Sequence, residues 1–296
     1  MPSFSFAQLA DRSIIRVSGE EAQHFLQNLV TANIDEIDRT GAGASALLTP
    51  QGKILFDFLI YKTDAAYLVD APSSTAADLL KRLTFYRLRA KVDLEMMPEG
   101  TAVFAVWDGT VQAESAITAV TDPRLPALGQ RLVGPVAALE GELGTETSDL
   151  QAYDAHRIKL GVPEGLKDFD YSDIFPHDAD LDQLGGVSFS KGCYVGQEVV
   201  SRVHHRGTAR KRFVQVQSSS LLPEKGTDVS ADGKSLGTLG SSTAADHGSI
   251  GLALLRLDKV RQAKDNGSPL QCGDAEITVK LPEWAEFALP EPDTAD

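Results

Sequence analysis

Residues 185–206 read GGVSFSKGCYVGQEVVSRVHHR and hold Cys193, one of the two cysteines in the chain. Gly192 and Gly196 flank this cysteine, and an acid, an amide and several bases follow it. A thiol near the start of a helix and close to cations has its pKa lowered, because the field favours the thiolate. The stretch therefore predicts a functional thiol entering a helix. The alternative is a small buried packing residue, which is also our expectation for Cys272.

Length and composition indicate an ordinary globular protein of two or three domains, with 296 residues, 42% hydrophobic and 24% charged. A net charge of −14 disfavours a protein that coats nucleic acid or binds an anionic membrane directly. We find no apolar run long enough for a transmembrane helix and no signal-peptide pattern. Two cysteines make no disulfide framework, which fits a reducing compartment and predicts a cytoplasmic protein.

The first half of the chain alternates strand and helix patterns with hairpins, which is typical of an α+β fold. Residues 14–17 predict a strand, and Ser18 with Glu21 forms a capping-box pattern before an apolar helical face. Two apolar runs flank Thr49-Pro50-Gln51-Gly52, which predicts a β-hairpin. Residues 75–85 predict an amphipathic helix.

The second half changes character twice. Ser148 with Gln151 forms a second capping-box pattern and opens a helix that runs to about Leu160. Residues 162–190 predict a long functional loop, and the chain after Arg206 predicts a small all-β domain, sandwich or barrel, without a helix. The predicted domains are an α+β region of two lobes over 1–206 that divides within roughly 95–145, a β-barrel over 207–285 and a disordered acidic tail over 286–296.

Basic residues cluster around the end of the opening stretch, against the sign of the whole chain. The cluster comprises Lys191, Arg202, Arg206, Arg210, Lys211 and Arg212, with His204 and His205 among them and Glu198 opposing. It predicts an anion-binding strip for carboxylates or phosphates; the alternative is a solvated linker between domains. The two histidines lack a third ligand at a suitable spacing, so we expect no metal site.

Two further residues are candidates for ligand contacts. Tyr153 shares a predicted helix face with Arg157 and could stack a flat heterocycle, or it could be part of the core. Asp57 interrupts an apolar run, where a carboxylate needs a partner such as a ligand ring nitrogen; an edge position facing water is the alternative. Nucleotide-binding and serine-hydrolase motifs are absent from the sequence.

The octapeptide KGCYVGQE, preceded by GGVSF and followed by Arg202, resembles the signature of the YgfZ family of folate-binding proteins, which includes the mitochondrial assembly factor for [4Fe–4S] proteins. The resemblance covers most of residues 14–212. Its motif positions are Lys191, Gly192, Cys193, Tyr194, Gly196, Gln197, Glu198 and Arg202.

This resemblance implies an aminomethyltransferase-like fold, with two mixed α+β lobes and a small C-terminal β-barrel around a folate-binding opening. It implies tetrahydrofolate as cofactor and Cys193 as the functional thiol. Tyr153 matches one folate-contacting aromatic. The family's second folate-contacting aromatic corresponds to a position near Arg12, and the Arg12 cation could instead bind the glutamate of folate. Arg157 is the third expected contact.

The implied function is that of an accessory factor for the assembly or repair of iron–sulfur enzymes, including tRNA-modifying radical enzymes. Its expected partners are iron–sulfur client or assembly proteins, without direct contact to nucleic acid or membrane. One alternative is a folate-dependent one-carbon transferase assisted by Asp57, although Phe56 stands where such enzymes carry a second aspartate. The other alternative is a binding module without folate.

Overall fold

The computed structural model describes residues 4–144, 147–207 and 209–290, which form two compact units. The first unit contains residues 1–153 and 184–197, and the second contains 154–183 and 198–296. The units interleave along the chain, and the domain boundaries expected from the sequence stay predictions. Residues 291–296 of the expected tail lie outside the described residues. No helix in the described ranges has the length and apolar character needed to cross a membrane.

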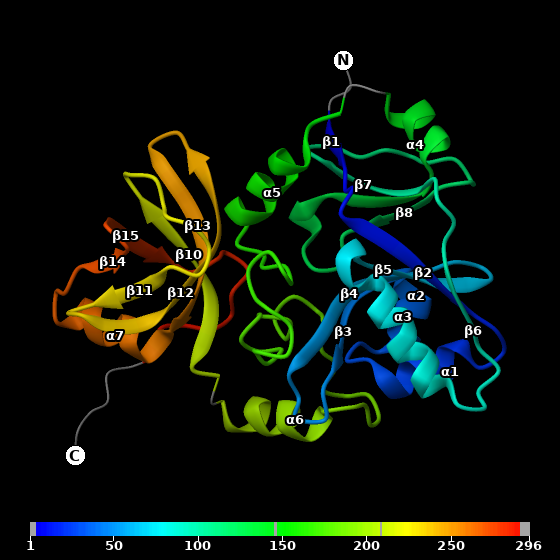
Figure 1. Ribbon diagram of the computed structural model, residues 1–296, viewed down its shortest axis with the longest axis horizontal. Coiled ribbons are helices and arrows are strands. Elements are labelled where there is room, and N and C mark those ends of the chain that lie inside the picture. The colour runs from blue at the N-terminus through cyan, green and yellow to red at the C-terminus, as the bar shows by residue number, and fades with distance from the viewer. Residues whose placement is uncertain (1–3, 145–146, 208, 291–296) are drawn as a thin grey trace. The chain divides into compact units, whose positions relative to one another are not determined.

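A five-stranded antiparallel sheet with strand order β3-β4-β5-β2-β6 organises one part of the first unit (Figure 1). Its strands are β2 (Arg12–Ser18), β3 (Ala42–Leu48), β4 (Ile54–Lys62), β5 (Ala66–Pro72) and β6 (Asp93–Met96). Helices α1 (Ala22–Leu29), α2 (Ile34–Thr40) and α3 (Ser73–Arg87) accompany the sheet. The predicted hairpin joins β3 to β4, where Gly52 takes a left-handed φ of 82° and donates to the Thr49 carbonyl at 2.8 Å.

A four-stranded sheet with order β1-β7-β9-β8 forms the other part of the first unit. It comprises β1 (Ser5–Gln8), β7 (Thr101–Trp107), β8 (Thr118–Thr121) and β9 (Gln130–Pro135), with the 3-10 turn η1 (Pro126–Leu128) and helix α4 (Val136–Leu143). One apolar cluster contains Ile14 and Tyr61 from the first sheet and Trp107 from the second. The two lobes of the first unit therefore share a core.

The second unit is built on a closed barrel with strand order β10-β13-β12-β11-β14-β15 (Figure 1). Its strands are β10 (Lys211–Ser218), β11 (Asp228–Ala231), β12 (Lys234–Ala245), β13 (Gly248–Arg256), β14 (Leu270–Cys272) and β15 (Ala275–Lys280). The α+β fold with a C-terminal barrel is thus confirmed. Cys272 is fully buried in the barrel core, as predicted for a packing residue.

Three helices complete the chain: α5 (Leu150–Lys159), α6 (Gln197–Arg206) and α7 (Leu257–Asp265). The prediction of a helix-free segment after Arg206 is wrong, because α7 lies between β13 and β14. Leu257, Val260 and Ala263 are buried on one face of it. This apolar stripe is short and carried by a mostly charged segment, so the helical period is weak in the sequence.

Both capping-box predictions are wrong. Ser18 is the last residue of β2, and α1 begins at Ala22, while the Glu21 carboxylate accepts a hydrogen bond of 2.6 Å from the Lys91 backbone. At α5, Asp149 rather than Ser148 accepts from the Ala152 backbone N–H, at 2.7 Å. A neighbouring residue supplies the cap in the second case, which pattern matching cannot distinguish.

Candidate functional site

Lys191, the first residue of the KGCYVGQE motif, is buried. Its Nζ atom donates to the carbonyl oxygens of Val30 at 2.7 Å and Ala32 at 2.8 Å. The same atom lies 5.3 Å from the centre of the Tyr194 ring. Burial lowers the pKa of the Lys191 ammonium to about 8. The amino group therefore anchors the motif to the connection between α1 and α2, and Lys191 does not belong to a solvent-facing anion strip.

The other end of the motif is held by Tyr194 and Gly196. The Tyr194 side chain is buried, and burial raises the pKa of its hydroxyl to about 12. Gly196 has a φ of 81°, and a Cβ atom there would lie 2.6 Å from the Thr49 carbonyl oxygen in the β3–β4 turn. This position therefore requires glycine for both its backbone conformation and its close approach.

Cys193 and Gly192 are exposed between these two anchors. The residues ahead of them are also tied down, because Thr31 donates its hydroxyl to the Gly186 carbonyl at 2.6 Å and accepts the Ser188 N–H through its own carbonyl at 2.9 Å. Helix α6 begins only at Gln197, so the thiol precedes the helix rather than lying in its first turn. The fold presents an accessible thiol on a loop that is pinned on both sides.

The predicted basic strip is only partly formed. Arg212 is buried and bound by Asp182 at 2.5 Å and Asp180 at 3.3 Å. Arg202 pairs with Glu198 at 2.6 Å on the exposed side of α6. With Lys191 buried in the first unit, the remaining exposed members are Arg202, Arg206, Arg210 and Lys211, together with His204 and His205.

Arg12, an expected folate contact, lies in an ion pair. Its Nε donates to the Asp70 carboxylate at 2.7 Å, and its side chain is 6% exposed. The Tyr61 hydroxyl donates to the other Asp70 oxygen at 2.5 Å, and burial followed by the Asp70 charge raises the pKa of Tyr61 well above its usual value. Asp70 thus has two partners inside the first unit, and Arg12 satisfies a buried carboxylate.

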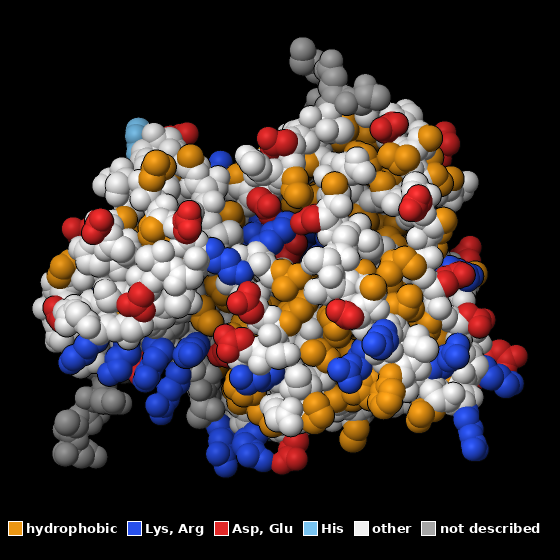
Figure 2. Space-filling view, viewed as in Figure 1, with side chains coloured by type: hydrophobic (Ala, Val, Ile, Leu, Met, Phe, Trp, Pro, Cys, Tyr) orange, Lys and Arg blue, Asp and Glu red, His pale blue; other side chains and the backbone are white. Residues whose placement is uncertain are grey.

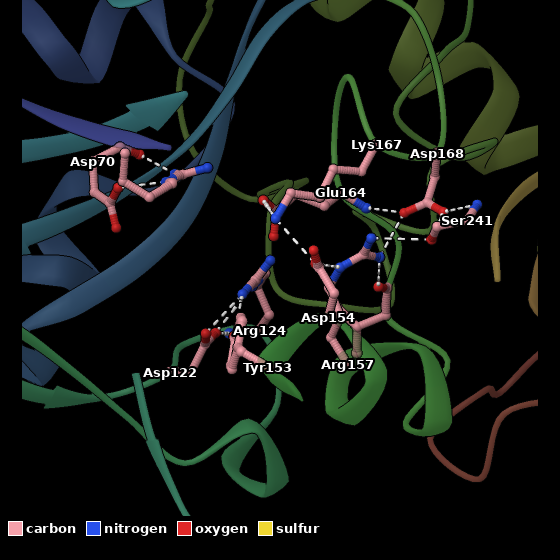
Figure 3. Close-up of polar contacts among 12 residues, drawn as sticks. Asp70, Asp122, Arg124, Tyr153, Asp154, Arg157, Glu164, Lys167, Asp168 and Ser241 are labelled. Atoms are coloured by element: carbon pink, nitrogen blue, oxygen red, sulfur yellow. Dashed lines mark hydrogen bonds and ion pairs between the residues drawn. The ribbon is translucent and has the colours of Figure 1, made fainter. Parts of the chain in front are cut away.

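Tyr153 is 1% exposed and belongs to a buried polar group in the first unit (Figure 3). Its hydroxyl accepts from Arg131 at 2.8 Å and from Arg124 at 3.3 Å, and both arginines also bind Asp122. Burial alone would raise the pKa of Asp122, but the Arg124 and Arg131 charges outweigh it and lower that pKa to about 2. The burial of the ring agrees with the alternative of a core residue, and its stacking role stays a prediction.

Arg157 forms the centre of a second buried network, in the second unit (Figure 3). It donates to Asp154 at 2.8 Å, to Asp168 at 2.7 Å and to the Ser241 hydroxyl at 3.0 Å. Burial opposes its charge, yet Asp168 and the neighbouring carboxylates raise the Arg157 pKa above its usual value. The side chain is fully buried, so its carboxylate partners come from the protein itself.

Asp57 lies in the middle of β4, opposite Ala46 of β3, and is half-buried next to the buried Phe56. Asp57 lies neither in the core nor at a strand end. Both predicted roles, a ligand contact and an edge position facing water, therefore stay open.

A cleft of about 1220 Å³ opens in the first unit. Residues of α2, the edge strand β8 and the segment 187–190 line it, with Glu36, Lys62 and Asp122 as the charged members. Neither Arg12 nor Asp57 nor Tyr153 is among the described residues that line it.

Tetrahydrofolate combines a flat heterocycle with carboxylates, and it needs an exposed ring or an available cation to hold it. Tyr153, Arg12 and Arg157 are buried with protein partners, so the three predicted contacts do not fit that requirement in this conformation. The Asp122–Arg131 pair was missed by sequence reasoning, since Arg131 carries no local signal.

Comparison with known proteins agrees with this fold. Residues 210–287 match the family described as CAF17, C-terminal beta-barrel domain. The glycine cleavage system aminomethyltransferase T of Bartonella henselae superposes with a TM-score of 0.75 at 14% identity, covering 96% of this chain and 87% of that one.

Curated relatives share the sequence over nearly its full length. The chain is 32% identical to the human mitochondrial iron-sulfur cluster assembly factor IBA57, covering 94% of this chain and 84% of that protein. It is 30% identical to the mitochondrial IBA57 homologue of Coccidioides immitis, with coverages of 96% and 84%. The sequence resemblance is thus confirmed where it names the mitochondrial assembly factor, and the chain belongs to the family of the iron–sulfur cluster assembly factor IBA57.

Proposed function

We propose that this chain supports the assembly or repair of [4Fe–4S] proteins and that Cys193 is its functional thiol. The observation that carries the proposal is the accessible Cys193 on a loop held by Lys191 and Gly196. A thiolate is a ligand for iron and a nucleophile, and both roles require access. The relatives named as iron–sulfur cluster assembly factors support the choice of chemistry.

The finer parts of the proposal rest on the sequence resemblance to the YgfZ family. They are tetrahydrofolate as ligand, tRNA-modifying radical enzymes among the clients, and client or assembly proteins as the partners of the thiol. A cytoplasmic location is the expectation from the sequence, whereas the relatives are mitochondrial by name. Fractionation of the native cells decides between the two compartments.

The test uses cells that lack the chain's own gene, complemented with the wild type, Cys193→Ala or Cys272→Ala. We expect Cys193→Ala to lower the activity of a [4Fe–4S] dehydratase while a [2Fe–2S] protein and the level of the variant stay unchanged. Cys272→Ala is the control for removing a thiol, since Cys272 is buried in the barrel. Full activity with Cys193→Ala would refute the thiol role.

Tetrahydrofolate binding is tested separately by calorimetric titration of the purified chain. Binding that persists in Cys193→Ala would show that ligand and thiol act independently. Absence of heat and of a thermal shift would favour a binding module without folate. Turnover of tetrahydrofolate that disappears in Asp57→Asn would instead assign a one-carbon transferase.

A further inference from the structure

The second unit carries a basic surface, although the net charge of the chain is −14. Two segments form it: residues 198–207 with 209–211, which contain the exposed part of α6, and residues 256–265, which contain α7. Their basic residues are Arg202, Arg206, Arg210, Lys211, Arg256, Lys259, Arg261 and Lys264, against Glu198, Asp258 and Asp265. Figure 2 shows blue side chains gathered over α7 and the end of α6.

The two segments are joined by contacts within the unit. The Leu257 backbone N–H, at the start of α7, donates to the Arg210 carbonyl at 2.9 Å. Lys211 and Arg256 are register partners in the β10–β13 ladder. At the other end, the His204 ring of α6 stacks on His177 at 6.4 Å, and Arg212 of β10 donates to the His177 carbonyl at 2.8 Å. These contacts link both segments to the barrel.

Each acidic residue of this patch forms an ion pair with a basic residue nearby in the sequence. Glu198 pairs with Arg202, Asp258 with Arg256 at 2.7 Å, and Asp265 with Arg261 at 2.8 Å. Arg206, Arg210 and Lys264 are exposed, and none of them makes an ion pair with a carboxylate of the described ranges. Lys211 and Lys259 are also exposed without such an ion pair, so five cations of the patch are not paired with a carboxylate of the described residues.

We propose that this basic surface docks an acidic patch on a partner protein. Guanidinium groups match carboxylates in geometry, and opposite charges across an interface speed association and fix its register. A long polyanion would extend past the patch and meet the acidic remainder of the chain, so a compact acidic protein surface fits better than a nucleic acid. Docking at this surface requires neither the Cys193 thiol nor bound folate.

A structural alternative exists for part of the patch. Arg206 lies in the last turn of α6, where a cation stabilises a helix through its dipole. That role predicts a loss of thermal stability on substitution without a change in binding, so the two readings are separable.

The experiment measures the fluorescence anisotropy of a labelled peptide of glutamate and aspartate residues, titrated with the full chain at low and high salt. Arg206→Glu, Arg210→Glu and Lys264→Glu are combined in one variant. Lys81→Glu, Arg82→Glu and Arg89→Glu, which lie at exposed positions in or next to α3, form the control with the same change in net charge. We expect the first variant to bind the peptide at least about tenfold more weakly than the wild type and to lose most of the salt dependence of binding. The control variant should keep an affinity and a salt dependence closer to those of the wild type.

The proposal is overturned if both variants bind the peptide alike. It is also overturned if transfer RNA, or vesicles of an anionic phospholipid, bind the wild type at lower concentrations than the peptide and lose binding in the first variant only. Melting temperatures of both variants, together with the milder Arg206→Ala, Arg210→Ala and Lys264→Ala combination, show whether weaker binding reflects unfolding.

Discussion

The Lys191 ammonium donates a hydrogen bond of 2.7 Å to the carbonyl oxygen of Val30, which lies 161 residues earlier in the chain. This contact closes a long loop on a buried backbone acceptor, and the Ala32 carbonyl accepts a second bond from the same nitrogen. The segment that carries Cys193 is therefore part of the folded first unit, and its position depends on a residue two places before the thiol.

Replacement of Lys191 by Met should destabilise the chain. Two buried carbonyls lose their donor, which costs about 1–3 kcal/mol for each group left unsatisfied, partly offset by removing a buried charge. Urea unfolding of wild type and variant at pH 7 measures the difference. An unchanged unfolding midpoint would contradict the anchoring role.

The same variant makes a prediction about pH. The Lys191 pKa is about 8 in the folded chain and 10.5 in the reference state, so the folded state loses the proton first as pH rises. Unfolding then takes up a proton between these values, and the stability contributed by Lys191 grows with pH across that window. Below pH 8 this contribution is constant. The stability gap between wild type and Lys191→Met should widen from pH 8 to 10.5, and a gap that stays flat would exclude the assigned shift.

Gly196→Ala should disrupt the motif. The left-handed φ of 81° and the approach of a Cβ to 2.6 Å from the Thr49 carbonyl oxygen both oppose a side chain, for a loss of about 1–3 kcal/mol. Gly192→Ala is the matched control, because nothing lies within 4 Å of a Cβ at that position. Alkylation of Cys193 by iodoacetamide, together with urea unfolding, compares the two. If Gly196→Ala and Gly192→Ala lose the same amount of stability and show the same change in alkylation of Cys193, the β3–β4 turn does not hold the loop.

Arg157→Met should be among the most damaging substitutions in the second unit. It leaves the Asp168 carboxylate, which is 0% exposed, without its cation, and breaking such a buried pair costs about 3–5 kcal/mol. Arg202→Met removes an exposed pair from α6 and should cost about 0–1 kcal/mol. Thermal unfolding measures both. A mild Arg157 variant that loses tetrahydrofolate binding would restore Arg157 as a ligand contact.

Asp122 makes the first unit sensitive to acid. Its pKa is lowered to about 2 from 3.8, so its ion pairs with Arg124 and Arg131 stabilise the folded state fully above pH 3.8. The contribution, about 2 kcal/mol, is lost as pH falls through 2. Asp122→Asn should flatten this part of the acid unfolding curve. If the acid unfolding curves of the wild type and of Asp122→Asn have the same slope, other carboxylates are responsible for the acid transition.

The fold and the location of the motif were predictable from the sequence because they depend on local patterns. The hairpin at Thr49–Gly52 follows from turn residues between apolar runs, and the barrel follows from short strands separated by turns. Helix α7 was missed because its apolar face is short. The two capping patterns failed because Ser18 belongs to strand β2 and because Asp149, not Ser148, accepts the backbone hydrogen bond at the start of α5.

The partners of the charged residues were not predictable, because they join distant segments. Lys191 and Arg212 belonged to one basic cluster in the sequence, yet the first binds carbonyls of the α1–α2 connection and the second binds Asp180 and Asp182. Arg12, too, is bound by a residue of another strand, Asp70. Only the tertiary fold decides which cations remain free for a partner.

The central claim is that Cys193 is the working group of an iron–sulfur assembly factor. Its most direct test is the activity of a [4Fe–4S] dehydratase in cells that lack the chain and express Cys193→Ala or Cys272→Ala at equal levels. We predict that activity returns with Cys272→Ala and stays at the level of the deletion with Cys193→Ala. Equal recovery with both variants would contradict the account.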